Sequence, residues 1–447
     1  MELSPTLATM LALLVIIMAA LTMDDLFIDL CALVFKVKPT HLTLQDLNKI
    51  PEKKIAIMIA NWHEDEVIEQ MITGNNQAIQ YSEHHFFLGV YPNDIKTLQA
   101  VHELEKKFSN VHAVINSKNG STSKGQMLNE IVDAIYVHEQ KAEFIFDLFV
   151  IHDSEDIIHP LSLKLMNLQA EAWDYIQIPI YSLNRETLDF TAGTYMDEFA
   201  EMHTKELLVR NALGAAIPSA GVGTCLNRRL LSYVQKMNGG TFLRPDSLTE
   251  DYILGWQSHL GGFRCRFACN TVQNAAGEKE IIATKEYFPG QFWQSVRQKT
   301  RWTIGIAFQG KRILRWAPNL RDNYFLLRDR RGPLNSLVTF ASLVVFLGIA
   351  LFSNLEFSSF EIWLVALTAF NFVGFVIRYV QRLRFYANVY GSCPAHLVLI
   401  RWPVAIIINA LAALRAFYQF YLSELGIKKL KWSKTQHTLP KEFGQTA

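Results

Sequence analysis

Long apolar runs near both ends of this 447-residue chain limit what it can fold into more than any other feature. Residues 6–22 read TLATMLALLVIIMAALT, and residues 336–353 and 360–380 are comparably apolar. About 20 such residues cross a bilayer as one helix. Half of all residues are hydrophobic, which is unusual for a soluble protein. The sequence therefore predicts helices in contact with a lipid bilayer at both ends.

The first apolar run fits either a retained anchor or a signal peptide. No basic residue precedes it and no small-residue cleavage site follows it, which favours an anchor. The next run, residues 26–35, is too short to span and ends at Lys36 and Lys38. That pattern predicts an interfacial helix on the cytosolic side. Residues 1–38 are thus expected to form a membrane anchor and an interfacial helix.

The C-terminal part is expected to hold membrane helices over residues 332–425 and a basic cytosolic tail over 426–447. Basic residues flank the two strong runs, whereas the link between them, NLEFSS, has none. The positive-inside rule then places the middle of the chain in the cytosol and the link outside. A third stretch, 395–422, contains Arg401 and Pro403. It is expected to be interfacial, re-entrant or a double crossing.

The middle of the chain, residues 39–331, alternates short β-type runs with polar helical stretches. The runs are KIAIMIA, HHFFLGVY, VHAVI, FDLFVIHD and DYIQIPIY. Such alternation predicts an α/β domain with a mostly parallel sheet. Sheets of this kind bind ligands at the carboxyl ends of their strands.

Acidic residues follow one of these runs in IHDSED, which contains Asp153, Glu155 and Asp156. Closely spaced carboxylates suit Mg²⁺ or Mn²⁺, which keep coordination positions for phosphate oxygens. A metal there would neutralise a diphosphate leaving group. The alternative is a solvated acidic turn that caps the next helix.

A second acidic cluster, SLTEDY, contains Thr249, Glu250 and Asp251. A carboxylate here could act as the general base that deprotonates an acceptor hydroxyl. The alternative is a helix N-cap, because Thr followed by two acids is a common start signal.

A third cluster, RQKTRW, places Gln298, Arg301 and Trp302 on one face of a helix. An amide, a guanidinium and an indole on one face can hold a diphosphate and stack on a sugar ring. The alternative is an amphipathic helix at the membrane surface, where Trp and Arg are also frequent.

Weaker candidates are single polar residues at strand ends or in loops: Glu64, Asp94 and Lys124. The turn PSAGVGT, residues 218–224, would let backbone approach a ligand. Net charge is near zero, so no nucleic-acid surface is expected. The five cysteines are scattered and predict neither a disulfide framework nor a zinc site.

The order of these clusters is more specific than any one of them. An acid after a strand, then DxE, TED, QxxRW and membrane helices resembles the processive family-two glycosyltransferases, which include cellulose and hyaluronan synthases. The resemblance implies a GT-A fold. It implies nucleotide contact by Asp94, metal binding by Asp153 and Glu155, catalysis by Asp251, and substrate contact by the QxxRW residues.

A closer resemblance is to the glycosyltransferase portion of the bacteriophage adsorption protein B family. It rests on YPND, SKGQMLN, HDSEDIIHP, DEFAEMH, PSAGVGTC, EYFPGQFWQSVRQKTRWTIGIAFQG and W-S-K-T-Q-H, and spans nearly the whole chain. Two departures are evident. The second acid of the DxD element is Glu155 here, and the PAWNE-type entry motif reads ANWHE.

Together these observations predict an inverting, metal-dependent glycosyltransferase of a bacterial inner membrane, with a cytosolic catalytic domain. The expected partners are a nucleotide-sugar donor (a UDP-sugar foremost), a growing exopolysaccharide or lipid-linked glycan, the bilayer, and an outer-membrane export partner. One alternative is an inactive membrane scaffold that docks envelope or secretion partners. A second is a transferase that adds a single sugar to a lipid carrier.

Overall fold

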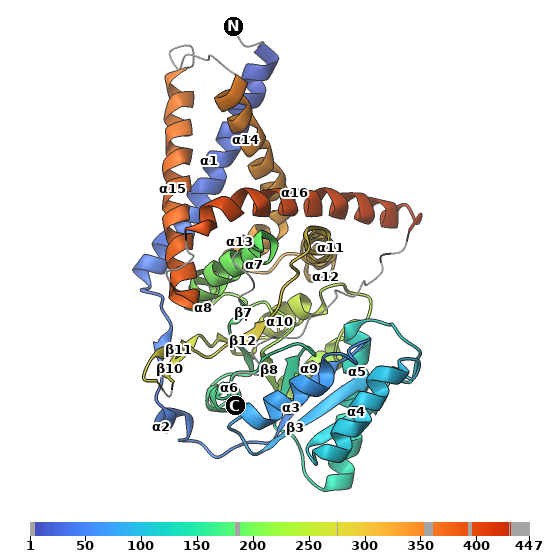
Figure 1. Cartoon of the computed structure of the whole chain (residues 1–447). Coiled ribbons are helices and arrows are strands. Elements are labelled where there is room, and N and C mark those ends of the chain that lie inside the picture. Colours follow the sequence, from blue (N-terminus) through green and yellow to red (C-terminus); the bar gives the residue numbers. More distant parts are fainter. Residues whose placement is uncertain are drawn as a thin grey trace.

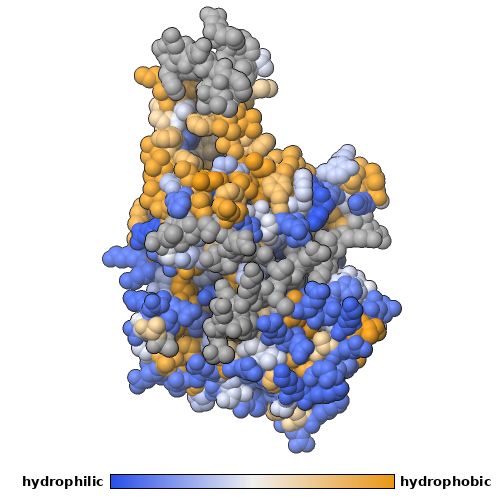
Figure 2. Space-filling view, in the orientation of Figure 1, coloured by the Kyte–Doolittle hydropathy of each residue, from blue (hydrophilic) through white to orange (hydrophobic). Residues whose placement is uncertain are grey.

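The computed structural model describes residues 5–183, 188–274, 276–352, 361–391, 396–428 and 430. A column of long helices stands on an α/β domain, and a layer of shorter helices lies between them (Figure 1). The surface of the column is largely hydrophobic, whereas that of the α/β domain is mostly hydrophilic (Figure 2). The two parts therefore face different surroundings.

The α/β domain is built on a seven-stranded sheet with the strand order β4-β3-β2-β5-β8-β6-β9. The first four of these strands are parallel, and β8 runs antiparallel to both of its neighbours. The strands are β2 (Ile55–Ala60), β3 (His84–Val90), β4 (Val111–Ile115), β5 (Leu148–His152), β6 (Tyr175–Gln177), β8 (Thr224–Asn227) and β9 (Cys265–Phe267). The expected α/β fold with a mostly parallel sheet is confirmed.

Helices cover both faces of this sheet. Phe86 and Leu88 of β3 pack on one face, whereas Phe87 between them packs on the other. The helices of the first face are α3 (Ile68–Ala78), α4 (Ile95–Lys107) and α6 (Ser162–Gln169); those of the second are α5 (Lys124–Ala142), α9 (Arg228–Met237) and α10 (Glu250–Leu260). Burial on both faces explains why β2, IAIMIA, is a continuous apolar run.

The run DYIQIPIY forms two strands rather than the single one expected. β6 ends at Gln177, and β7 (Ile180–Ser182) pairs with β12 (Thr284–Glu286) in a separate sheet. Pro179 lies between them and has no N–H to donate to a continuing ladder. A third small sheet joins β1 (Thr40–His41), β10 (Asn270–Gln273) and β11 (Lys279–Ile281).

The layer next to the helical column consists of shorter helices. They are α7 (Phe190–Glu201), the π-helix η1 (Met202–Glu206), α8 (Leu207–Ala212), α11 (Phe292–Thr303), the π-helix η2 (Ile304–Gln309), α12 (Gly310–Leu314) and α13 (Leu320–Arg330). α2 (Leu44–Leu47) lies apart from this layer, at the base of the domain (Figure 1).

The column contains α1 (Pro5–Val34), α14 (Gly332–Phe352) and α15 (Ile362–Tyr390), which run side by side (Figure 1). Among the described residues, α1, α15 and α16 (Leu397–Glu424) are each long and apolar enough to cross a membrane. α13 and α14, which meet at an angle of 51°, together form a fourth candidate span if the bent pair is counted as one. The apolar helices expected at both ends are present.

α1 is one continuous helix, where the sequence predicts an anchor followed by a separate interfacial segment. The stretch between the two expected segments contains neither proline nor glycine, so nothing interrupts the helix. The acidic residues of the helix, Asp24, Asp25 and Asp29, all lie in its second half.

α16 lies across the column rather than alongside it (Figure 1). It is a single helix that includes Pro403, so the expected double crossing by two helices is not formed. The link at 354–359 and the tail over 431–447, including W-S-K-T-Q-H, lie outside the described residues.

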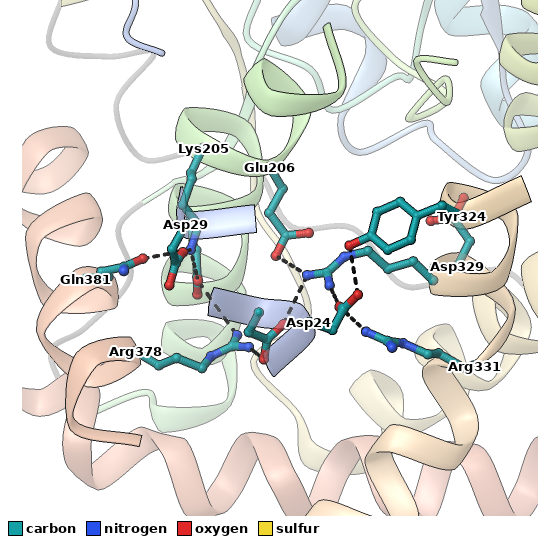
Figure 3. A network of polar contacts seen from close by, with 12 residues as sticks. Asp24, Asp29, Lys205, Glu206, Tyr324, Asp329, Arg331, Arg378 and Gln381 are labelled. Carbon is teal, nitrogen blue, oxygen red and sulfur yellow. Dashed lines mark hydrogen bonds and ion pairs between the residues drawn. The ribbon is translucent and has the colours of Figure 1, made fainter. Parts of the chain in front are cut away.

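A cluster of ion pairs, here called the junction network, joins the column to the middle layer (Figure 3). Lys205 of η1 donates to Asp29 of α1 at 2.8 Å, to Glu201 at 2.9 Å and to Gln381 of α15 at 2.8 Å. The other members are Asp24, Asp25, Glu206, Arg210, Arg328, Asp329, Arg331, Arg378 and Arg382. The network ties residues that are about 300 positions apart in the chain.

Candidate active site

The carboxyl end of β5 carries the first candidate group. Asp153 directly follows the strand, and its Oδ1 lies 2.5 Å from Nζ of Lys124, the first residue of α5. The same Nζ donates to the carbonyl oxygen of Gly221 at 2.9 Å. Lys124 therefore joins the end of β5 to the glycine-bearing turn before β8.

The rest of the IHDSED turn is buried. Asp156 Oδ2 lies 2.7 Å from His152 Nδ1, within hydrogen-bond distance, and accepts a hydrogen bond from the backbone N–H of Asp153 at 3.0 Å. Burial lowers the pKa of His152 to about 3, so the ring is neutral. The alternative of a solvated acidic turn is wrong, because Glu155 and Asp156 are both buried. Asp156 shapes the turn, while Asp153 retains 31% side-chain exposure.

The TED cluster begins α10. Thr249 makes no side-chain capping hydrogen bond, so the expected capping alternative does not hold for its hydroxyl. Asp251 Oδ1 accepts from the backbone N–H of Tyr252 at 2.7 Å. A β-carbon at Gly221 would lie 2.6 Å from Asp251 Oδ2, and φ there is +83°. Only glycine fits this position, which brings Asp251 next to Lys124.

Charge in this cluster is unevenly balanced. Burial, and then the charge of Asp251, raises the pKa of Glu250 to about 7. Burial also raises the pKa of Asp251, against the lowering influence of Lys124 and Arg301. Burial opposes the charge of Lys124, but Asp153 and the two TED carboxylates outweigh it and raise its pKa. Carboxylates thus outnumber the basic groups among Lys124, Asp153, Glu250, Asp251 and Arg301.

The QxxRW residues lie on α11. The Oε1 of Gln298 accepts from the hydroxyl of Tyr195 at 2.8 Å. Trp302 lies edge-on to Tyr195, with ring centroids 6.1 Å apart, and joins an apolar cluster with Phe199 and Phe288. The indole therefore forms part of an aromatic cluster.

Gly305, in the π-helix that continues α11, brings this helix against the TED cluster. A β-carbon at Gly305 would lie 2.2 Å from Thr249 Oγ1. Any larger residue would separate the two segments. The close approach explains how a helix more than 40 residues downstream reaches Glu250 and Asp251.

The end of β3 carries Asp94, which is buried. Its Oδ2 accepts from the backbone N–H of His63 at 2.6 Å, and His63 has a φ of +55°. Glu64 is also buried, and its N–H donates to Thr97 Oγ1 at 3.0 Å. These residues fix the loop after β2 against the start of α4.

Comparison with known proteins identifies the domain. The family model "Glycosyltransferase like family 2" matches residues 51–305, which is more than half of the chain. The chain belongs to glycosyltransferase family 2. The matched segment begins just before β2 and ends in η2, so it includes the IHDSED, TED and QxxRW residues.

Two curated relatives of this family-2 glycosyltransferase are similar over most of its length. They are bacteriophage adsorption protein B of Escherichia coli (strain K12) and bacteriophage N4 adsorption protein B of Escherichia coli O157:H7. Each is 37% identical over 464 residues, which covers 97% of this chain and 62% of the relative. The chain therefore spans less than two thirds of the length of these relatives, and the expected family resemblance is confirmed.

A solved structure shares the fold of this glycosyltransferase. It is a mannosyltransferase from Pyrobaculum calidifontis in complex with GDP-Man and Mn²⁺. The TM-score is 0.55 at 12% identity, with 91% of this chain and 99% of that chain covered. The expected GT-A fold is confirmed.

In this glycosyltransferase domain, the structure brings Lys124, Asp153, Glu250, Asp251 and Arg301 together. Glu64 and Asp94 lie at the ends of the neighbouring strands β2 and β3, outside this group. Sequence reasoning missed Tyr195 and Gly305. The helical spacing of RQKTRW gives no information on either, because both act through contacts between distant segments.

Proposed function

We propose that this family-2 glycosyltransferase transfers a sugar from a nucleotide-sugar to a hydroxyl acceptor, with inversion at the anomeric carbon. The donor class that we propose first is the UDP-sugars, and the acceptor is a growing exopolysaccharide or a lipid-linked glycan. The observation that supports this best is the placement of Asp251 Oδ2 beside Gly221 and Lys124. A partly buried carboxylate with a raised pKa there suits proton removal.

The proposed metal site is Asp153 with Glu155. Their oxygen ligands suit Mg²⁺ or Mn²⁺, and the excess of carboxylates over basic groups favours a bound divalent cation. Asp156 would support the site from behind, because its Oδ2 holds the backbone N–H of Asp153. A bound cation would neutralise negative charge on the diphosphate of the donor. The mannosyltransferase with the same fold was solved with Mn²⁺, which fits this proposal.

In the proposed step, Asp251 accepts the proton of the acceptor hydroxyl. The acceptor oxygen forms a bond to the anomeric carbon, and the bond from that carbon to the diphosphate oxygen breaks. The nucleoside diphosphate leaves from the opposite face. Arg301 would donate hydrogen bonds to this leaving group.

The remaining residues are assigned to binding. Gln298, held by Tyr195, and Lys124 would contact the diphosphate, and Trp302 would border the acceptor sugar. Glu64 and Asp94 would fix the loop that receives the nucleotide. Glu250 would set the charge around Asp251, since the pKa of each carboxylate depends on the other.

We place the protein in a bacterial inner membrane with residues 39–331 in the cytosol. α1, α14 and α15 would cross the bilayer, and α16 would lie along its inner surface. α14 is 21 residues long, which corresponds to about 30 Å and matches the apolar core of a bilayer. Lys36, Lys38 and the basic residues of α13 all lie at the domain end of the column, as the positive-inside rule requires.

Release of nucleoside diphosphate by the purified protein tests the proposed activity. The protein would be supplied with UDP-, GDP- and CDP-sugars, each with and without a chelator, followed by restoration of Mg²⁺ or Mn²⁺. We expect release from one donor class, loss on chelation and recovery on restoration. Asp153→Ala should weaken donor binding and abolish the response to metal. Activity that survives thorough chelation would refute the metal site.

The outcome also separates the alternatives. An inactive scaffold would release no nucleotide from any donor, and a single-addition enzyme would give products one sugar longer than the acceptor. The proposed export partner would be tested separately, by cross-linking in intact cells.

Thiol labelling tests the proposed membrane arrangement. Single cysteines would replace Glu361, at the outer end of α15, and Leu425, after α16, in a background without the native cysteines. We expect an impermeant reagent to label the first position in intact cells and the second only after lysis. Labelling of the second position from outside would mean that α16 crosses the bilayer.

A further inference from the structure

A cluster of three histidines lies at the end of the sheet opposite the carboxylates. His85 is near the start of β3, His112 near the start of β4, and His138 in the last turns of α5. In the β3–β4 pairing, Phe87 stands opposite His112. Because side chains two residues apart share a face, His85 points to the same side as Phe87, toward α5.

The three rings are close enough to share one ligand. One nitrogen of each ring lies within 4.8 Å of the corresponding nitrogen of the other two. The Nδ1 of His85 is 2.8 Å from the Nε2 of His112, and the ring centroids of His112 and His138 are 4.3 Å apart. Zinc–nitrogen bonds of about 2.0–2.1 Å place neighbouring ligand nitrogens about 3.3 Å apart in a tetrahedral site. Small ring rotations would reach that geometry.

The surroundings of the cluster favour neutral imidazoles. Phe87, Phe144 and Phe146 pack against the rings. Burial, followed by the neighbouring histidines, lowers the pKa of both His85 and His112 to about 4. The charged groups near the rings are Lys54 and Glu83, which pair with each other at 2.5 Å, and Glu139 and Lys141 beside His138. Neutral imidazole with a free lone pair is the form that binds transition metals.

The donor set differs in kind from that of the proposed catalytic site. The group contains three imidazole nitrogens and no carboxylate. Imidazole suits Zn²⁺, Ni²⁺, Cu²⁺ and Co²⁺, whereas Mg²⁺ and Mn²⁺ prefer oxygen ligands. Three histidines also leave one tetrahedral position for water.

We propose that His85, His112 and His138 bind one transition-metal ion, with Zn²⁺ as the expected occupant. The ion would cross-link the β3–β4 edge to α5. α5 also carries Lys124 at its first turn, and 14 residues separate Lys124 from His138, which corresponds to about 21 Å along the helix. The site is therefore separate from the catalytic carboxylates, but it anchors the same helix.

Metal titration of the intact protein tests this proposal. After removal of any affinity tag and stripping with chelator, Zn²⁺ binding would be measured by calorimetry and elemental analysis. Co²⁺ would be followed by its visible absorption. We expect one saturable Zn²⁺ per chain and an absorption band typical of nitrogen-ligated Co²⁺. Zn²⁺ should also raise the melting temperature, and Mg²⁺ should not compete.

Variants separate ligation from other effects. Removal of a group that only supports a metal ligand weakens metal binding about 10- to 100-fold. Removal of a ligand itself should have a larger effect, so His138→Gln or His112→Gln should weaken Zn²⁺ binding at least about 100-fold. The matched control is His102→Gln, an exposed histidine on α4, which should bind normally. Asp153→Ala should also retain this Zn²⁺. Without metal, the variants and the wild type should have the same melting temperature. If they do, a variant whose melting temperature no longer rises with Zn²⁺ has lost metal binding rather than its fold.

Two results would overturn the proposal. One is Zn²⁺ binding by the wild type that is no tighter than binding by His138→Gln. The other is binding that persists in the histidine variants but is lost in Asp153→Ala. Either would identify the cluster as a hydrogen-bonded histidine stack, without altering the conclusion on transferase activity.

Discussion

The candidate active site and the junction network both bury many charges, but they balance them differently. In the network, every acid has a basic partner: Lys205 pairs with Asp29 and Glu201, and Arg210 pairs with Asp329. In the active site, Lys124 and Arg301 face a larger number of carboxylates. The network can therefore stabilise the fold as it stands, whereas the active site lacks positive charge that a metal ion would supply.

Buried charges therefore have two different roles in this chain. Buried, fully paired charges fix the geometry between segments, and removal of one partner leaves the other unpaired. In the active site, Glu250 is buried and Asp251 partly buried, and both have raised pKa values, because the nearby positive charge compensates them only in part. Unbalanced charge of this kind is typical of functional sites, which often lower stability.

The largest expected effect is on activity. Asp251→Asn should reduce turnover about 10²- to 10⁴-fold, because Asn cannot accept the acceptor proton. Donor binding should change little, and the melting temperature should rise, since the substitution removes a partly buried charge with a raised pKa. Turnover and thermal melting of the purified protein would be measured.

The matched control is Asp246→Asn, an exposed acid in the segment before α10. This variant should have nearly the same turnover and the same melting temperature as the wild type. Near-normal turnover in Asp251→Asn would refute its assignment as base.

The opposite behaviour is expected in the network. Lys205→Met should lower the free energy of unfolding by about 3–5 kcal/mol, because it leaves Asp29 and Glu201 without this partner. Lys106→Met, at an exposed pair with Glu103, should change it by at most about 1 kcal/mol. Thermal unfolding of both variants in detergent checks these values. Equal losses of stability in the two variants would show that the buried and the exposed pair do not differ.

A smaller effect is expected from Glu250→Gln. The pKa of Glu250 is about 7 in the folded protein, above its unfolded value, so its contribution to stability is present at low pH and is lost as pH rises through 7. The variant should be more stable than wild type above pH 7, on the order of 2 kcal/mol. The difference should disappear near pH 4. Melting across pH tests this, and a constant difference would contradict it.

The smallest effect concerns the link between the two regions. The hydroxyl of Tyr252 donates to Asp329 of the network at 2.9 Å, while its backbone N–H holds Asp251. Tyr252→Phe should cost about 1 kcal/mol of stability and reduce turnover only a few-fold. The control is Tyr136→Phe, which loses a hydrogen bond to Gln235 far from the site. It should lower the free energy of unfolding by a similar amount without changing turnover. Equal turnover in the two variants would show that the regions are independent.

The sequence predicts many local features of this fold. The strand VHAVI has the predicted bounds, 111–115, and the apolar runs become helices of the column. These features depend on neighbouring residues, through burial on both faces of a strand or the length of an apolar helix. The division of DYIQIPIY at Pro179 was predictable in principle, because proline cannot continue a ladder.

The candidate site was only partly predictable. Asp94 and Asp153 follow strands, so sequence places them at the ligand-binding edge of a parallel sheet. Glu250, Asp251 and Arg301 reach the same place only because Gly221 and Gly305 allow close approach between distant segments. The family resemblance connects these residues, whereas their spacing along the chain does not.

Local patterns in the sequence thus predicted the runs that form β2 to β7, the apolar helices and the segments that carry carboxylates, because periodicity and composition act over a few residues. The tertiary structure alone decided that α16 lies across the column, held by the ion pair of Arg401 with Asp197. It also decided that His85, His112 and His138 meet, although at least 25 residues lie between each and the next. Such meetings depend on sheet order and helix packing, which bring together side chains that no local pattern relates.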